Sequence, residues 1–179
     1  TATDTFNTAV GYEAGNLVTT GVRNTLVGGL SGDALTTGAR NTGLGYATLS
    51  SDTLGSRSVA VGYHALVTQN FTTATDSNNV AVGYVAGESV TTGLYNTFVG
   101  GDAGKLLTDA DQNVAVGTFA LDKDELGSKT TAIGYGALST QDFTTATNSY
   151  NTAVGFHSGV NLTTGVENSI IGALAGDAL

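Results

Sequence analysis

Few residues of this chain could carry out catalysis, and they lie far apart. The two histidines, His64 and His157, each follow a copy of the same repeated motif in distant parts of the sequence. General acid–base catalysis or metal binding needs a histidine beside a second base or ligand. We therefore expect both histidines to be surface or packing residues. The sequence predicts no catalytic residue, no metal site and no cofactor, so we do not expect an enzyme.

The acidic residues gather in one stretch, at Asp109, Asp111 and residues 122–125. Carboxylates brought together across successive turns of the chain could hold Ca²⁺. The stretch lacks the glycine–aspartate nonapeptide of calcium-binding β-rolls. We favour solvated turn carboxylates that aid solubility.

Basic residues recur at a fixed spacing in Arg23, Arg40 and Arg57. Such a ladder of guanidinium groups could bind a sulfated or carboxylated glycan. The corresponding residues further along the chain are Tyr95, Gln112 and Lys129, so the pattern does not persist. A solvated edge is the preferred interpretation.

Aromatic residues also recur at one position of the repeat. If exposed, their rings could stack on sugars; alternatively they could form a stacked packing column inside the chain or between chains. We favour the packing column. Its members are Tyr12, Tyr46, Tyr63, Tyr84, Tyr135 and Phe156.

Two Thr-rich segments contain the best candidates for surface recognition, Asn70 with Phe71 and Asp142 with Phe143. An aromatic residue in a polar loop could project towards a receptor. The two copies are almost identical, however, and loops shaped by changing receptors tend to diverge. A structural brace is therefore an equally good interpretation.

The element that must position these residues is a hexapeptide repeated ten times. Most copies start at one constant spacing, two intervals are longer by the same amount, and such a fixed short period is typical of a solenoid. The copies are NTAVGY (from 7), NTLVGG (24), NTGLGY (41), SVAVGY (58), NVAVGY (79), NTFVGG (96), NVAVGT (113), TTAIGY (130), NTAVGF (151) and NSIIGA (168).

A larger repeat contains four of these coils, of which the last is the long one. Its copies span 7–78 and 79–150, and a partial third copy spans 151–179. We expect one uninterrupted array over residues 1–179 without linkers. Because the chain begins and ends partway through a repeat, we expect a segment of a longer fibre.

The motif predicts short strands, since it combines β-branched, aromatic and small residues. Thr-Thr-Gly or Leu-Gly-Ser segments predict the turns. The fold class is therefore all-β, a parallel β-solenoid of the β-roll or β-helix type with ten 17-residue or 21-residue coils. Parallel strands about 4.8 Å apart would make it roughly 48 Å long.

Three motif positions have a physical interpretation. The fourth residue is Val, Leu or Ile in every copy, and we expect it to form the core. The fifth is always Gly, which indicates a positive φ or another backbone too close for a Cβ. The first is Asn in most copies, which suggests amide bonds from coil to coil.

The third and sixth motif residues vary together. Where the third is bulky (Leu26, Phe98), the sixth is small (Gly29, Gly101), so we hypothesise that the two share space, at a bulge or across neighbouring chains. The wall opposite the motif is apolar in some coils and polar in others. This interrupted core favours chains intertwined or packed as a homotrimer.

Composition excludes several classes of partner. With a net charge of −9 and only six basic residues, the chain is not expected to bind nucleic acid. No apolar run is long enough to span a membrane, so no membrane insertion is expected. Without cysteine, no disulfide can form.

The repeats resemble two known kinds of protein. SVAVGYHAL (58–66), NVAVGYVAG (79–87) and TTAIGYGAL (130–138) resemble the head repeats of trimeric autotransporter adhesins, which form parallel β-rolls. The chain is also similar to the NTAVGY-type repeats of bacteriophage tail fibres and related trimeric surface fibres. Autotransporter heads usually run shorter coils than those found here, which favours the phage-fibre type.

The resemblance implies an extracellular protein, on a virion or a bacterial cell surface. The leading hypothesis is a structural or adhesive segment of a phage tail fibre that presents a receptor-binding region to a host surface, where a glycan or protein would be the receptor. One alternative is the head domain of a bacterial trimeric autotransporter adhesin. Another is a monomeric β-solenoid that binds ice or carbohydrate through its threonines.

Overall fold

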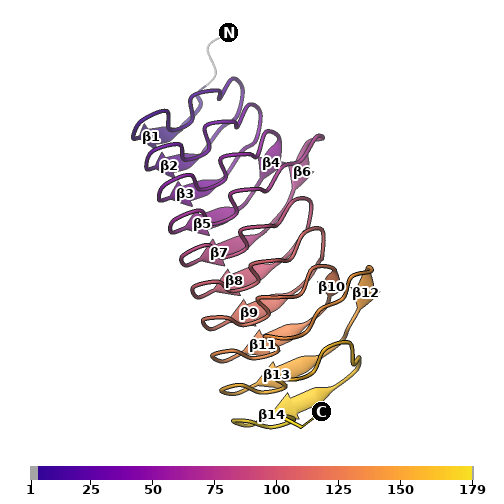
Figure 1. Ribbon diagram of the computed structural model, residues 1–179. Helices are drawn as coiled ribbons and strands as arrows, with labels where there is room; N and C mark the ends of the chain where they lie inside the picture. Colours follow the sequence, from indigo (N-terminus) through magenta and orange to yellow (C-terminus); the bar gives the residue numbers. More distant parts are fainter. Residues whose placement is uncertain (1–3, 179) are drawn as a thin grey trace.

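The computed structural model describes residues 4–178, and in this part the chain is one parallel β-solenoid without a helix (Figure 1). The predicted all-β solenoid of ten coils is thereby confirmed. Ten short strands stack in chain order into one sheet that runs the length of the rod. They are β1 (Thr8–Val10), β2 (Thr25–Val27), β3 (Thr42–Leu44), β5 (Val59–Val61), β7 (Val80–Val82), β8 (Thr97–Val99), β9 (Val114–Val116), β11 (Thr131–Ile133), β13 (Thr152–Val154) and β14 (Ser169–Ile171).

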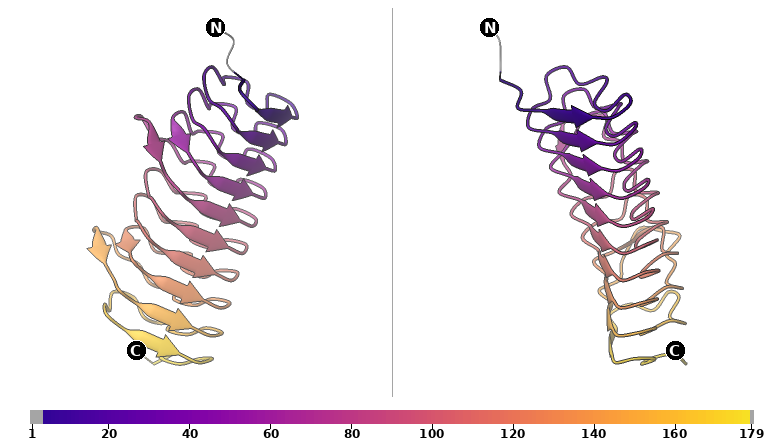
Figure 2. Two further views of the ribbon diagram at one scale, coloured as in Figure 1. Left: turned by 180° about the vertical axis from the view of Figure 1, so that it is seen from behind. Right: turned by 90° about the vertical axis from the view of Figure 1, so that its left-hand side faces the viewer.

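The extra residues of each long coil form a side projection. Strand β4 (Gly55–Ser56) pairs with β6 (Thr75–Asp76), and β10 (Gly127–Ser128) pairs with β12 (Thr147–Asn148). Both two-stranded sheets lie on the same side of the rod, away from the tips of the main strands (Figure 2).

The main sheet is in strict register, because every pair joins residues at the same motif position, as in Thr8 with Thr25. The glycine at the fifth position makes this stacking possible. Its φ lies between 125° and 149° in all ten coils, and a Cβ would clash with the next coil's glycine carbonyl in every coil but the last. Both explanations offered by the sequence are therefore correct.

The asparagine column joins coil to coil, as expected. Oδ1 of Asn24 accepts a hydrogen bond from the N–H of Asn41 at 2.9 Å, and its Nδ2 donates to the carbonyl of Gly38 at 2.9 Å. The same pair of bonds recurs at Asn96, with Asn113 and Ala110 as partners. Each amide thus satisfies a buried N–H and a buried C=O that the turns leave open.

The expectation that the fourth motif residue forms the core is wrong. Alternate residues of a strand point to opposite faces, and here it is the third residue that points inward. Ala60, Ala81 and Ala115 are fully buried, whereas Val27 and Val99 are 37 % exposed. The two walls of each coil lie close together, so the inward position takes alanine in most coils, and the branched residues face outward.

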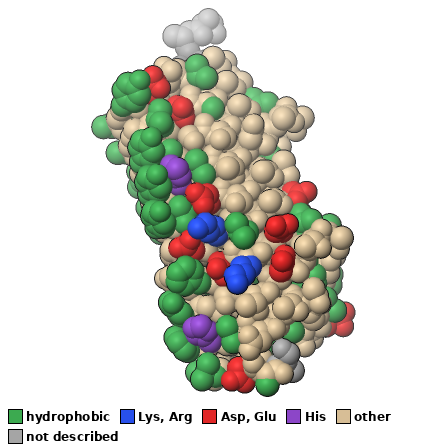
Figure 3. Space-filling model, viewed as in Figure 1, with side chains coloured by type: hydrophobic (Ala, Val, Ile, Leu, Met, Phe, Trp, Pro, Cys, Tyr) green, Lys and Arg blue, Asp and Glu red, His purple; other side chains and the backbone are tan. Residues whose placement is uncertain are grey.

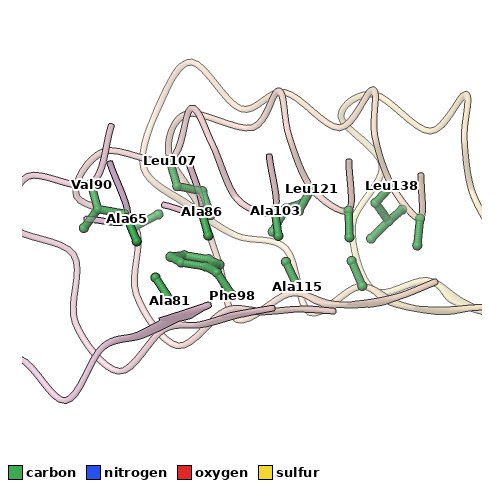
Figure 4. Close-up of a cluster of buried hydrophobic side chains, with 14 of the residues drawn as sticks. Ala65, Ala81, Ala86, Val90, Phe98, Ala103, Leu107, Ala115, Leu121 and Leu138 are labelled. Carbon is green, nitrogen blue, oxygen red and sulfur yellow. The ribbon is translucent and has the colours of Figure 1, made fainter. Parts of the chain in front are cut away.

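The hypothesis that the third and sixth residues share space within the chain is also wrong, because Leu26 and Phe98 point into the core while Gly29 and Gly101 lie at the surface on the other face of the chain. Bulky third residues are instead accommodated by glycines at the ninth position. A Cβ on Gly32 would lie 2.8 Å from Leu26, and one on Gly87 would lie 2.8 Å from the ring of Phe98. Figure 4 shows that ring filling the space beside Ala86.

In some coils the large core side chain is the third motif residue, on the strand, and in others it is the ninth residue, on the wall opposite the strand. Where the ninth residue is leucine, as in Leu49, Leu66, Leu121 and Leu138, the third is alanine or glycine. Where both positions are small, as at Ala81 and Gly87, the ring of Phe98 reaches in from the next coil. The hydrophobic cluster thus remains continuous from Leu49 to Ile170.

Candidate functional site

Of the four residues predicted for surface recognition, two are buried and two are exposed. Phe71 and Phe143 are only 5 % and 6 % exposed, so of the two interpretations the structural brace fits these rings. Asn70 and Asp142 beside them are exposed. The N–H of Phe143 donates to Oδ1 of Asp124 at 3.0 Å, which ties the start of the insert to the previous coil. The phenylalanines thus brace the insert, and its exposed tips are residues 72–74 and 144–146.

A buried polar network underlies each insert. Nε2 of Gln69 donates to Oδ2 of Asp52 at 2.6 Å and to Oγ of Ser58 at 2.9 Å, while its Oε1 accepts from Asn79 at 2.9 Å. This glutamine carries the asparagine ladder past Ser58, where the motif lacks asparagine. Gln141 makes the equivalent bonds in the second long coil. Nothing in the local sequence predicts this role.

Burial raises the pKa of Asp52 above its ordinary value of 3.8. Hydrogen bonds from Gln69 and from the N–H groups of Gly55 and Phe71 oppose this shift, but desolvation outweighs them. Desolvation likewise raises the pKa of the partly buried Asp33 and Asp122. These three carboxyl groups therefore hold a proton more readily in the folded chain than in water.

The histidines lie in aromatic surroundings at distant coils. The ring of His64 stacks on Tyr63 with centroids 4.0 Å apart, and its Nδ1 is 3.7 Å from a carboxylate oxygen of Glu88. His157 lies against Phe156 at 4.4 Å. Each histidine packs on the aromatic residue that precedes it.

The acidic stretch is dispersed by the fold. Asp124 is buried in the network described above, and Asp111 accepts the N–H of Leu94 at 2.7 Å. Within residues 4–178, no group of three or more histidine, cysteine or acidic side chains is placed to hold a metal ion, and no pocket is present. Nor does that part of the chain contain a helix with the length and apolarity to cross a membrane.

The arginine ladder lies exposed at one edge of the sheet. Arg57 pairs with Asp76 at 3.2 Å, whereas Arg23 and Arg40 form no ion pair with the described residues. All three arginines have a left-handed φ near 60°.

Threonine hydroxyls at the turns are largely used within the chain. Thr19 donates to the carbonyl of Thr36 at 3.2 Å, and Thr36 donates to that of Thr53 at 3.1 Å. Thr108 makes the same kind of bond to Glu125. These bonds link successive coils, which leaves fewer hydroxyls for a ligand or for ice.

The tyrosine column is stacked, as one interpretation required, but it is not internal. The rings of Tyr63 and Tyr84 are 5.5 Å apart and nearly parallel, and those of Tyr46 and Tyr63 are 5.6 Å apart. Between 44 and 74 % of each tyrosine is exposed. Within the run from Tyr46 to Tyr84 the stacked rings cover one another's faces, which leaves less ring area there for stacking sugars.

The main surface feature is the outward face of the sheet, formed by the second and fourth motif residues. It carries Thr, Val, Leu, Ile and Ser side chains and no charge along all ten strands. Beside it, hydrophobic side chains gather along one edge of the rod (Figure 3). The most exposed aliphatic residues of the outward face are Val10, Val27, Leu44, Val99, Ile133 and Ile171.

Comparisons of the sequence and structure with family models, curated proteins and solved structures give no match. The functional argument therefore depends on the geometry and on the resemblance of the repeats.

Proposed function

We propose that the chain is a structural segment of an adhesive fibre of the phage tail-fibre kind, assembled as a homotrimer. In this function the rod is extracellular, as part of a virion, and holds a receptor-binding region at a distance from its anchor. The observation that carries the proposal is the uncharged, half-exposed outward face of the ten-stranded sheet.

A face of this kind is expected to be covered by a partner. Long contiguous apolar patches on soluble proteins mark interaction surfaces, and single exposed apolar residues do not. The face repeats once per coil along the whole rod, so its partner must have the same period. A second copy of this chain, aligned in parallel, meets that requirement at every strand.

The resemblance of the repeats favours three copies, since the proteins that they resemble form trimeric surface fibres. A parallel ring of three brings the outward faces of all copies together around one axis, so that the face is covered along the whole rod.

The role that follows is mechanical. Backbone and asparagine hydrogen bonds connect every coil to the next along the rod. The length of the coils favours the tail-fibre type over the autotransporter head, whose coils are shorter. A rod of this kind sets distance and direction for the receptor-binding region.

The test is the mass in solution, measured by light scattering coupled to size exclusion over a dilution series. We expect three times the 17.9 kDa of one chain, independent of concentration. A folded species of 17.9 kDa would overturn the trimer and favour a solitary solenoid, for which thermal hysteresis and glycan binding become the next measurements.

A further inference from the structure

Two glycines at the aromatic edge have no explanation within the chain. We use "aromatic edge" for the column of sixth motif residues, which is aromatic in six coils and has Thr118 and Ala173 in two others; only Gly29 and Gly101 leave it without a side chain. Neither has a positive φ. A Cβ on Gly101 would meet only a methyl group of Thr118 at 4.0 Å, and one on Gly29 would lie at an ordinary 3.5 Å from Tyr46. The other glycines whose surroundings are described have a left-handed φ or a neighbour too close for a Cβ.

The opposite edge of the same face carries large side chains at these two levels. We use "leading edge" for the column of residues immediately before each motif. Arg23 precedes the strand that ends at Gly29, and Tyr95 precedes the strand that ends at Gly101. Tyr95 is 53 % exposed, and Arg23 is also exposed.

Symmetry places these residues opposite one another. In a ring of identical chains about an axis parallel to the rod, each contact is heterologous and joins residues at the same height. The leading edge of one copy therefore meets the aromatic edge of the next, coil against coil. This step rests on the homotrimer proposed above.

We infer that Tyr95 and Arg23 of each copy fill the places left by Gly101 and Gly29 of its neighbour. The edges thus act as knobs and holes that fix the register of the chains along the fibre. The covariation of bulky third residues with small sixth residues then has two separate causes, one in the core and one between chains.

Three other levels are consistent with the same pairing, because Arg40 of one copy would face Tyr46 of the next, Arg57 would face Tyr63 and Lys129 would face Tyr135. At two further levels both edges are aromatic, Phe6 with Tyr12 and Tyr150 with Phe156, and there ring would pack on ring. A cation against a tyrosine ring is a favourable contact, especially when both are partly removed from water.

Two of these cations also have partners in their own chain. Arg57 pairs with Asp76, and Nζ of Lys129 lies 5.2 Å from the ring centre of Tyr150. The contact of Lys129 with Tyr150 runs along the leading edge, whereas Asp76 belongs to β6 in the side projection.

Cysteine pairs test the inference cleanly, since the chain has no cysteine of its own. A disulfide requires Cα atoms within about 7 Å. We expect Tyr95→Cys/Gly101→Cys and Arg23→Cys/Gly29→Cys to give covalent trimers on oxidation with copper phenanthroline. The controls recombine the same four substitutions as Tyr95→Cys/Gly29→Cys and Arg23→Cys/Gly101→Cys. These pairs lie four coils, roughly 19 Å, apart in height and should not cross-link.

The outcomes separate this inference from the trimer itself. If light scattering shows a trimer while the matched pairs fail to cross-link, or the recombined pairs cross-link as well, the edge pairing is wrong and the trimer stands. A monomeric mass for the unmodified chain overturns both. Circular dichroism confirms folding of each variant before oxidation.

A second pair of variants needs no oxidation. Gly101→Tyr has room within its own chain but would fill the hole, so we expect its trimer to dissociate at a concentration at least tenfold higher than the parent. Adding Tyr95→Gly moves the knob to the other edge and should restore much of the loss. A Gly101→Tyr trimer as stable as the parent would overturn the pairing.

Discussion

At the scale of single residues, the buried asparagines of the motif connect each coil to its neighbours. The side chain of Asn96 accepts the N–H of Asn113 at 2.9 Å and donates to the carbonyl of Ala110 at 2.8 Å. Its own N–H donates to Asn79 at 2.8 Å. Through its side chain and its backbone N–H, this one asparagine therefore connects three coils in the buried interior.

Replacing this amide should be costly. Asn96→Ala leaves one buried N–H and one buried C=O without a partner, and each such group costs about 1–3 kcal/mol. We expect the free energy of unfolding to fall by about 3 kcal/mol, as measured by chemical denaturation followed by circular dichroism. Asn148→Ala is the control, because Asn148 is exposed and makes no side-chain hydrogen bond with the described residues. Equal losses in both variants would contradict the ladder.

The raised carboxyl pKa values predict an unusual dependence of stability on pH. Below the ordinary value of 3.8, Asp52 is protonated in the folded and the unfolded chain alike. As the pH rises, the unfolded chain releases its proton first, so stability falls until the folded-state carboxyl also ionises. Asp33 and Asp122 act in the same direction. We expect Tm to decrease from about pH 4 towards neutrality, starting at the unfolded-state pKa.

The matched variant is Asp52→Asn, which cannot ionise. It should be less stable at low pH, because its amide N–H₂ would face Nε2 of Gln69. It should also show a smaller decrease in Tm between about pH 4 and pH 7, because one of the shifted groups is gone. A Tm that rises over this interval in the parent protein would refute the assignment.

At the scale of elements, most coils fill their core with a large side chain that comes either from the third motif position or from the ninth. In the coil from Asn96, Phe98 reaches across from the strand, and Gly104 makes room for it. In the next coil, Leu121 reaches from the opposite wall towards Ala115. Both arrangements bury one large side chain in the same space.

A double-mutant cycle tests this exchange. Phe98→Ala alone should cost about 3–5 kcal/mol through the cavity that it leaves. Gly104→Leu alone should also destabilise, because the new side chain would clash with the ring of Phe98. The two changes together reproduce the arrangement of Ala115 and Leu121, whose φ of 53° shows that leucine tolerates this backbone. We expect the double variant to unfold at a higher temperature than either single variant. Additive losses in thermal denaturation would contradict the model of exchange.

The sequence predicts the strands, the register and the roles of glycine and asparagine correctly, because these depend on the backbone spacing that the repeat reports directly. It does not predict which face is buried. A three-residue strand has two possible inward sets, and the usual preference for burying Val over Ala selects the wrong one here. Ala60 and Ala81 lie inside because the space between the walls is narrow, which is a tertiary property.

The sequence fails to predict the burial of Phe71 and Phe143 for a related reason. Both come shortly after a glutamine and lie in Thr-rich segments that have no apolar periodicity. Their position depends on Asp52 and Asp124 in the previous coil, 19 residues earlier in each case. No local pattern reports such a contact, although the pair recurs unchanged in both copies of the larger repeat, and that recurrence is a signal for it.

At the scale of the whole molecule, the single rod is unbalanced. The inward position of the motif strand is mostly alanine, while the Val, Leu and Ile residues at the fourth motif position face outward along the entire sheet. A lone chain would expose those residues to water, whereas three chains would convert the outward faces into a second core around the axis. The stability of the rod should therefore depend on its assembly.

A charge on the outward face distinguishes these two situations. Val99 lies at the middle of the face and is 37 % exposed in one chain, so Val99→Glu should barely affect an isolated solenoid. In a trimer, the substitution would place three carboxylates close to the axis without counter-ions, which is strongly unfavourable. We expect light scattering to show the mass of one chain, with a lower Tm. Thr92→Glu, at an exposed turn away from the face, is the control and should remain trimeric. A trimeric Val99→Glu variant with parental Tm would show that the face lies outside the interface.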